Sequence, residues 1–197
     1  MRVDTSQELD SGDATLEIPW EDPSGPEVCY VDLKVHPEAI DRLAECRRHP
    51  SLAELLRHIN APESIFRTAK CDVWETTELA EDERLDFGSA YKVGSYVDLL
   101  FDKEEMKSDL HAHRQLAERV QEAVKGLRVQ AQLELVVRRC LFHPEERWGY
   151  YLTIFAHAYG AVPAEAQGQW KLAMAGLGDV LVEIDLGYRG EGRSLLR

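Results

Sequence analysis

The chain of 197 residues is long enough to bury its own core, and 44% hydrophobic with 30% charged residues is typical of an ordinary globular protein. The formal net charge of −13 argues against nucleic acid as a partner. No apolar run approaches the roughly 20 residues of a membrane span, which argues against a membrane partner. Four widely spaced cysteines without a CxxC pair favour reduced thiols in a cytoplasmic protein over disulfides or a zinc site.

The acidic residues are concentrated in two segments. Residues 1–26 contain seven acids against Arg2, and three prolines interrupt any regular period. A segment this polar and broken has too little apolar surface to fold alone, so we expect a disordered acidic N-terminal arm. Residues 75–86 contain six acids against Arg84 and are expected to form an acidic loop between two strands.

The first predicted elements are a strand, two helices and a second strand. Residues 28–35 alternate between apolar and polar side chains, which predicts a strand. Pro37 suits the first turn of a helix, and Pro50 breaks that helix and precedes a second one. Residues 65–76 alternate again and predict the second strand.

The middle of the chain carries the strongest periodic signals. Residues 91–101 predict a third strand, and residues 104–126 predict a helix because apolar side chains recur there every three or four positions. Residues 129–142 and 149–159 alternate on either side of a polar turn. These two segments are therefore predicted to pair as a β-hairpin.

The C-terminal part predicts a third helix and a last strand. The helix begins at Pro163 and is expected to stop before Gly176 and Gly178, because glycine commonly ends helices. Residues 180–186 alternate and predict a strand. Residues 188–197 are rich in glycine and arginine and are expected to form a flexible tail.

A short repeat suggests how these elements assemble. The tetrapeptide Tyr-Val-Asp-Leu occurs at residues 30–33 and again at 96–99, each time at a strand that leads into a helix. The element order β-α-β-β-α-β, followed by β-α-β, predicts an α+β fold with a ferredoxin-like sandwich made of two pseudo-duplicated βαβ halves. We expect one domain over residues 27–187, with the ferredoxin-like core at 27–142 and a β-α-β extension at 149–187.

The repeat also predicts a candidate site on the sheet face that no helix covers, called the helix-free face below. The two repeated strands should be parallel neighbours, which would place Asp32 and Asp98 about 5 Å apart on this face. Two carboxylates that close raise the pKa of one of them, and His157 would add a further acid-base group. The side chains expected to bind a ligand on the same face are Tyr30, Tyr96, Lys70, Glu134 and Arg138.

Two other interpretations explain the same polar face. Oppositely charged and aromatic side chains on neighbouring strands form cross-strand pairs that stabilise any antiparallel sheet. The face could also be buried in a dimer, which its aromatic content suits. A slip of one residue in the strand register would reverse the two faces, so these alternatives stay open at this point.

No P-loop, GxSxG or HExxH motif occurs in the sequence, and we expect neither a cofactor nor a metal. The leading hypothesis is therefore a non-catalytic binding or regulatory module that uses the helix-free face and self-associates. The alternative is a small-molecule enzyme or ligand carrier that uses Asp32, Asp98 and His157 as acid-base groups. A third hypothesis is an acidic inhibitor or immunity-type protein that presents residues 75–86 to a basic protein partner.

Overall fold

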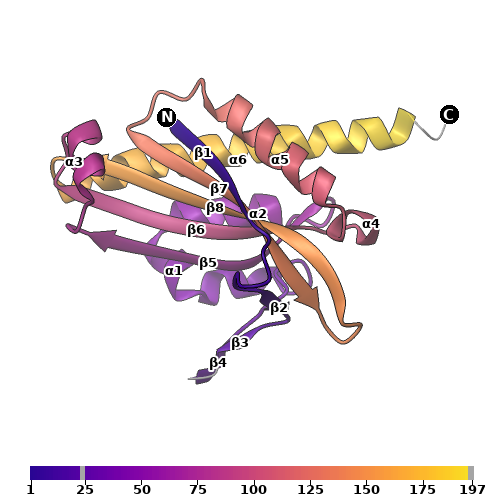
Figure 1. The fold of residues 1–197 in the computed structure, drawn as a ribbon. Helices are drawn as coiled ribbons and strands as arrows, with labels where there is room; N and C mark the ends of the chain where they lie inside the picture. Colours follow the sequence, from indigo (N-terminus) through magenta and orange to yellow (C-terminus); the bar gives the residue numbers. More distant parts are fainter. Residues whose placement is uncertain (23–24, 195–197) are drawn as a thin grey trace.

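The computed structural model of the protein describes residues 1–22 and 25–194, without the side chains of residues 26–27 and 191–194. It shows a mixed α+β fold in which one curved sheet is packed against helices (Figure 1). The six-stranded sheet has the order β1-β7-β8-β6-β5, and β2 also pairs with β7. No helix within the described residues is both long enough and apolar enough to cross a bilayer.

Four long strands form the body of the sheet and pair with one another in antiparallel fashion: β5 (Phe66–Thr76), β6 (Tyr91–Phe101), β7 (Ala131–Phe142) and β8 (Arg147–Gly160). Two short strands run parallel to β7 along its outer edge: β1 (Arg2–Glu8) and β2 (Leu16–Ile18). A separate hairpin consists of β3 (Glu21–Asp22) and β4 (Gly25–Cys29). The alternation in residues 129–142 and 149–159 is confirmed as the β7–β8 hairpin.

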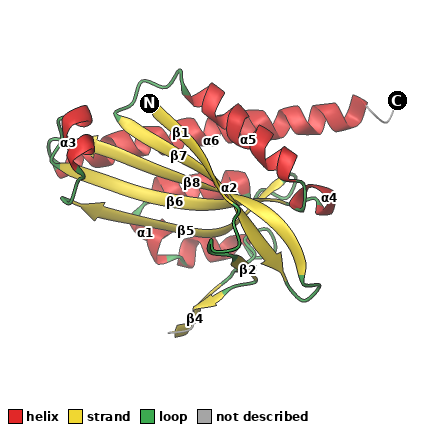
Figure 2. Cartoon of the chain, in the orientation of Figure 1, coloured by secondary structure: helices red, strands yellow, loops and turns green. Residues whose placement is uncertain are grey.

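The helices, coloured red in Figure 2, lie between these strands in the chain, except α6, which follows the last strand. They comprise the 3-10 helix η1 (Pro37–Arg42) and the α-helices α1 (Ala44–Arg48), α2 (Pro50–Ile59), α3 (Glu81–Phe87), α4 (Glu104–Lys107), α5 (Leu110–Val124) and α6 (Pro163–Ser194). The apolar sides of α2, α5 and α6 share one core with one face of the sheet. Trp170 of α6 is fully buried there, and its indole N–H donates to the Ser95 hydroxyl of β6 at 2.9 Å.

The predicted ferredoxin-like strand order is not found. In that fold the first and third strands are parallel neighbours at the sheet centre, whereas here β6 lies between β8 and β5 and is antiparallel to both. Residues 30–36 contain no strand, so the prediction that 28–35 and 91–101 lie side by side is wrong. The physical reason is local, because Asp32 accepts a hydrogen bond from the backbone N–H of Lys34 and starts a turn.

Three further expectations are corrected at the chain ends. Residues 2–8 and 16–18 are strands of the main sheet and not part of a disordered arm, because β7 offers them a free edge. Residues 180–186 are not a strand but the middle of α6. The same helix includes residues 188–194 of the predicted flexible tail, and the remaining residues 195–197 lie outside the described part.

Candidate functional site

The helix-free face presents three consecutive cross-strand rows of side chains. The strand register places Asp72, Tyr96, Phe155 and Glu134 side by side across β5, β6, β8 and β7. We call this central set the acid–aromatic row. On one side of it lies a row with Trp74, Gly94, His157 and Gln132, and on the other a row with Asp98, Thr153 and Val136. Alternation along each strand therefore brings these residues to one surface.

Four half-buried aromatic side chains meet on this surface. The rings of Tyr96 and Phe155 lie 5.9 Å apart, and those of Phe155 and His157 lie 6.3 Å apart. The indole of Trp74 meets the His157 ring edge-on at 5.9 Å. Burial lowers the pKa of His157, with the Lys92 ammonium adding to the effect, so the ring is neutral at physiological pH.

Trp74 reaches His157 because the intervening position on β6 is a glycine. A Cβ atom at Gly94 would lie only 2.4 Å from Cε2 of the indole, so any side chain there would displace Trp74. The indole thus covers the backbone of β6 and connects the edge strand β5 with β8. Glycine at this position is required by the close approach of the ring.

Asp98 is the one carboxyl group buried in the middle of this face, with 5% of its surface exposed. It accepts a hydrogen bond from the Thr153 hydroxyl at 2.7 Å. Burial raises the pKa of Asp98 to about 6, although the Thr153 hydrogen bond and the charges of Arg138 and Lys70 act in the opposite direction. Desolvation therefore outweighs these favourable partners.

Arg138 connects this network to the N-terminal strand. Its guanidinium donates to the Thr153 hydroxyl at 3.2 Å and forms two hydrogen bonds with Glu8 of β1, at 2.7 and 3.0 Å. It also lies over the Phe155 ring at 5.4 Å. Arg138 is therefore held by an acid and an aromatic ring together, as in other cation–π contacts of arginine.

Both ends of the helix-free face are covered. The acid–aromatic row and the row with Trp74 and His157 form an open band between the covers, whereas Asp98, Thr153 and Val136 beside it are buried. At one end the Phe87 ring of α3 stacks on Tyr159 at 3.9 Å, and Glu83 accepts hydrogen bonds from Lys92 and from the Tyr159 hydroxyl. At the other end a second apolar cluster forms beneath the β2 region: Leu16, Ile18, Ala69, Leu100, Cys140, Phe142 and Tyr151.

The structure separates the two predicted carboxylates. Asp32 lies in a turn, where it accepts a hydrogen bond from Arg67 of β5 at 2.9 Å, and Arg67 also pairs with Asp102. Asp98 is surrounded by Thr153 and Arg138 instead, and Asp32 is not among the charges that shift its pKa. Asp32 therefore does not form a pair with Asp98.

The remaining predicted residues divide between two places. Tyr30 packs with Asp32 beside a polar cavity at the covered end, away from the open band. Tyr96 and Glu134 lie in the acid–aromatic row, and Arg138 lies on the same face, one row beyond Thr153 and opposite Tyr151. His157 is four residues along β8 from Thr153, the partner of Asp98, which corresponds to about 13 Å.

Lys70 sits at the bulge in β5, between the open band and the strand edge. Its ammonium lies 4.4 Å from the Trp20 ring, which explains why it forms no ion pair with the described residues. The indole N–H of Trp20 in turn donates to the Ala69 carbonyl at 2.9 Å. Lys70 is therefore turned to the covered end of the face.

The sequence argument assigned neither Glu8 nor Asp72 to the candidate site. Glu8 was placed in a disordered arm, and its pairing with Arg138 depends on β1 adding to β7. Asp72 stands at an outward position of an alternating strand, and that alternation was the available signal.

Comparison of the chain with family models, curated proteins and solved structures finds no match. In the described part of the chain no group of three or more His, Cys, Asp or Glu side chains is placed to hold a metal ion.

Proposed function

We propose that the protein is a non-catalytic binding module that recognises a basic segment of a partner protein on its helix-free face. The acid–aromatic row is the observation that carries this proposal. Two half-buried rings, Tyr96 and Phe155, stand between the carboxyl groups of Asp72 and Glu134. Neither carboxyl group forms an ion pair with any residue in the described ranges 1–22 and 25–194.

This arrangement suits a lysine or arginine side chain. A cation over a Tyr or Phe ring gains about 0.5–1 kcal/mol at an exposed site, and carboxylates on both sides add hydrogen bonds. Arg138 already lies over the Phe155 ring, so this surface accommodates a guanidinium against an aromatic ring, and the partner's cation would lie over the neighbouring Tyr96 ring. The net charge of −13 would attract a basic partner from a distance.

The same geometry favours binding over catalysis. An acid-base mechanism needs its groups within about 3 Å of the reacting atoms. Thr153, the neighbour of Asp98 on β8, lies about 13 Å along that strand from His157, and Asp32 is held elsewhere by Arg67. The three residues on which the small-molecule enzyme hypothesis depends, Asp32, Asp98 and His157, are therefore not brought together.

Two other occupants compete for the role of partner. A second copy of the chain could cover the open band, as the sequence suggested. Alternatively, the acidic segment 75–86 could bind the basic partner; there Glu83 is engaged with Lys92 and Tyr159, which leaves Glu81 and Asp82 exposed on α3.

The proposal is tested by calorimetric titration with hexaarginine and, as a control, hexaserine. The key variant is Asp72→Asn/Glu134→Gln, which neutralises the acid–aromatic row. Its matched control is Glu81→Gln/Asp82→Asn, which removes the same amount of charge from α3. A third variant, Tyr96→Leu, keeps an apolar side chain but removes the ring.

We expect hexaarginine to bind the wild type, and the row variant to bind about tenfold more weakly. Tyr96→Leu should weaken binding several-fold, while the α3 control should change it less than twofold. Equal losses in both charge variants would mean that only net charge matters and would refute recognition by the row. A larger loss in the α3 variant would move the site to residues 75–86. A concentration-dependent dimer in sedimentation velocity that Phe155→Glu dissociates would identify a second copy as the occupant.

A further inference from the structure

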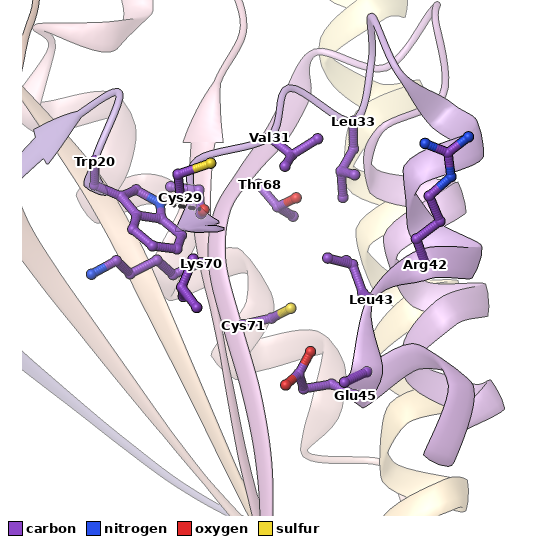
Figure 3. A pocket seen from close by; sticks show the side chains of 13 residues that line it. Trp20, Cys29, Val31, Leu33, Arg42, Leu43, Glu45, Thr68, Lys70 and Cys71 are labelled. Carbon is purple, nitrogen blue, oxygen red and sulfur yellow. Dashed lines mark hydrogen bonds between the residues drawn. The ribbon is translucent and has the colours of Figure 1, made fainter. Parts of the chain in front are cut away.

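A cavity that is separate from the acid–aromatic row lies at the free edge of β5, the edge that does not pair with β6. It has a volume of about 370 Å³ and opens between β5 and the segment 28–45 (Figure 3). This volume lies at the lower end of the range of about 300–1,000 Å³ for small-molecule sites. Nothing in the proposed recognition of a basic segment uses this cavity.

The cavity exists because of an irregularity in the edge strand. The pairing of β5 with β6 shifts between Thr68 and Cys71, so β5 bends where no further strand covers its edge. The segment before η1 runs past this bend and does not pair with it. Trp20 closes one wall, because its indole donates to the Ala69 carbonyl and its own carbonyl accepts from the Tyr30 N–H at 2.8 Å.

The walls are mainly apolar. Val31, Leu33 and Leu43 approach from the segment before α1, and Thr68 and Cys71 approach from β5 (Figure 3). Burial raises the pKa of the Cys71 thiol far above its usual range, and the nearby charge of the Glu45 carboxylate adds to the effect. The thiol is therefore neutral and contributes an apolar surface, not a nucleophile.

One carboxyl group is directed at this apolar interior. Figure 3 shows the Glu45 carboxylate pointing toward Cys71, and its charge raises the pKa of that thiol. The ammonium of Lys70 points the other way, toward the Trp20 ring at 4.4 Å. Arg42 is exposed at the rim. Glu45 itself forms no ion pair or side-chain hydrogen bond with the residues that the structure describes.

From this combination of an apolar cavity and one unpaired carboxylate, we propose that the cavity binds a small hydrophobic amine. The hydrocarbon part lies among Val31, Leu33 and Leu43, and the ammonium group donates to Glu45. A ligand with a carboxylate in the same place would put two negative charges close together without a cation between them, which is unfavourable. A neutral alcohol would keep the apolar contacts but lose the charge-assisted hydrogen bond.

The test compares three ligands with the same hydrocarbon chain: octylamine, octanol and octanoate. Each is titrated into the full-length protein by calorimetry at neutral pH. Glu45→Gln removes the charge while keeping the size of the side chain. Glu54→Gln, on the exposed side of α2, is the matched control. Val31→Phe fills the cavity without removing an apolar contact, and its thermal unfolding shows whether it remains folded.

Octylamine should bind at least fivefold more tightly than octanol, and octanoate should bind weakest. Glu45→Gln should weaken octylamine binding five- to tenfold and change octanol binding less than twofold. Val31→Phe should weaken all ligands at least tenfold, and Glu54→Gln should change nothing. The proposal is overturned if octanoate binds as tightly as octylamine, if Glu45→Gln leaves octylamine binding unchanged, or if none of the three binds. Because Asp72, Tyr96 and Glu134 stay intact in all these variants, this outcome is independent of peptide recognition.

Discussion

Replacing Asp98 with asparagine should stabilise the folded protein at neutral pH, although Asp98 makes a good hydrogen bond. The carboxyl group is 5% exposed and accepts from the Thr153 hydroxyl at 2.7 Å. Its pKa is nevertheless raised from 3.8 to about 6, first because burial penalises the charged form. The ionised form of Asp98 therefore lowers the stability of the folded state.

The size of that cost follows from the pKa. A rise from 3.8 to about 6 is about 2 units, and at 1.36 kcal/mol per unit this amounts to about 3 kcal/mol at pH 7.5. The asparagine keeps an oxygen that accepts the hydrogen bond from Thr153. Its buried amide N–H groups are left without a hydrogen-bond acceptor, which costs about 1 kcal/mol of stability. The net expectation for Asp98→Asn is a gain of about 2 kcal/mol at pH 7.5.

The sign of the effect changes with pH. A carboxyl group whose pKa is raised on folding contributes stability that is fully present below its unfolded pKa of 3.8 and is lost as the pH rises through about 6. The free energy of unfolding of the wild type should therefore rise relative to that of the variant as the pH falls from 7.5 towards 4. Near pH 4 the order should reverse, because the protonated Asp98 no longer carries the cost of a buried charge.

Urea unfolding of wild type and Asp98→Asn, measured at half-unit steps from pH 4 to 7.5, checks this expectation. Asp82→Asn, which removes one exposed carboxyl group on α3, serves as the control for the loss of a charge without the loss of burial. A free-energy difference between Asp98→Asn and the wild type that does not vary with pH would refute the reasoning. A destabilised variant at pH 7.5 would do so as well.

Two further variants test packing and burial. Gly94→Ala should cost about 1–3 kcal/mol, because the new Cβ would lie 2.4 Å from the Trp74 indole; in a Trp74→Ala background the cost in urea unfolding should largely disappear, and an unchanged cost would place the strain elsewhere. Burial lowers the pKa of the fully buried His113, so the stability it contributes is present above 6.5 and is lost as the pH falls. His113→Leu should therefore unfold with a flatter pH dependence between pH 7 and 5, and an unchanged slope would contradict this role.

Strand periodicity predicted most of the sheet. The four long strands begin and end within two residues of the alternating segments, because one face of each is buried under helices and the other is open. In β5 the alternation was only partly informative. The bulge between Thr68 and Cys71 brings Phe66 and Thr68 to the same face as Cys71, which simple alternation does not reveal.

The repeated tetrapeptide did not indicate a duplicated strand, because its two copies lie in different structural environments. Val97 and Leu99 are buried in β6 under the helices. Val31 and Leu33 instead line the cavity beside β5, in a segment held by the turn at Asp32. Alternation over four residues does not show whether a neighbouring strand is available to pair.

The glycines in α6 were misread as a helix end. Gly176 lies where a Cβ would be 2.6 Å from the Leu127 side chain, and Gly178 faces Leu55 of α2. Gly176 allows close packing of α6 on Leu127, whereas a Cβ atom at Gly178 would make only an ordinary contact with Leu55. The burial of this part of α6 outweighs the weak intrinsic helix propensity of glycine. The N-terminal strands were missed for a related reason, since their pairing with β7 comes from contacts such as Glu8 with Arg138.

The sequence predicted which face of the sheet carries the candidate site, but not all of the residues that form it. Tyr96, Asp98, Glu134 and Arg138 share the helix-free face because they occupy outward positions of strands whose register is fixed by the core. Asp32 was assigned there through the repeat alone. Its actual partner, Arg67, depends on a turn whose position no periodic pattern encodes.

Amide chemical-shift mapping during a titration with hexaarginine tests the central claim most directly. If the acid–aromatic row binds basic segments, the largest shifts should fall at Asp72, Tyr96, Phe155 and Glu134, and should be abolished in Asp72→Asn/Glu134→Gln. Shifts confined to the acidic segment 75–86, or shifts that persist in that variant, would contradict recognition on the helix-free face.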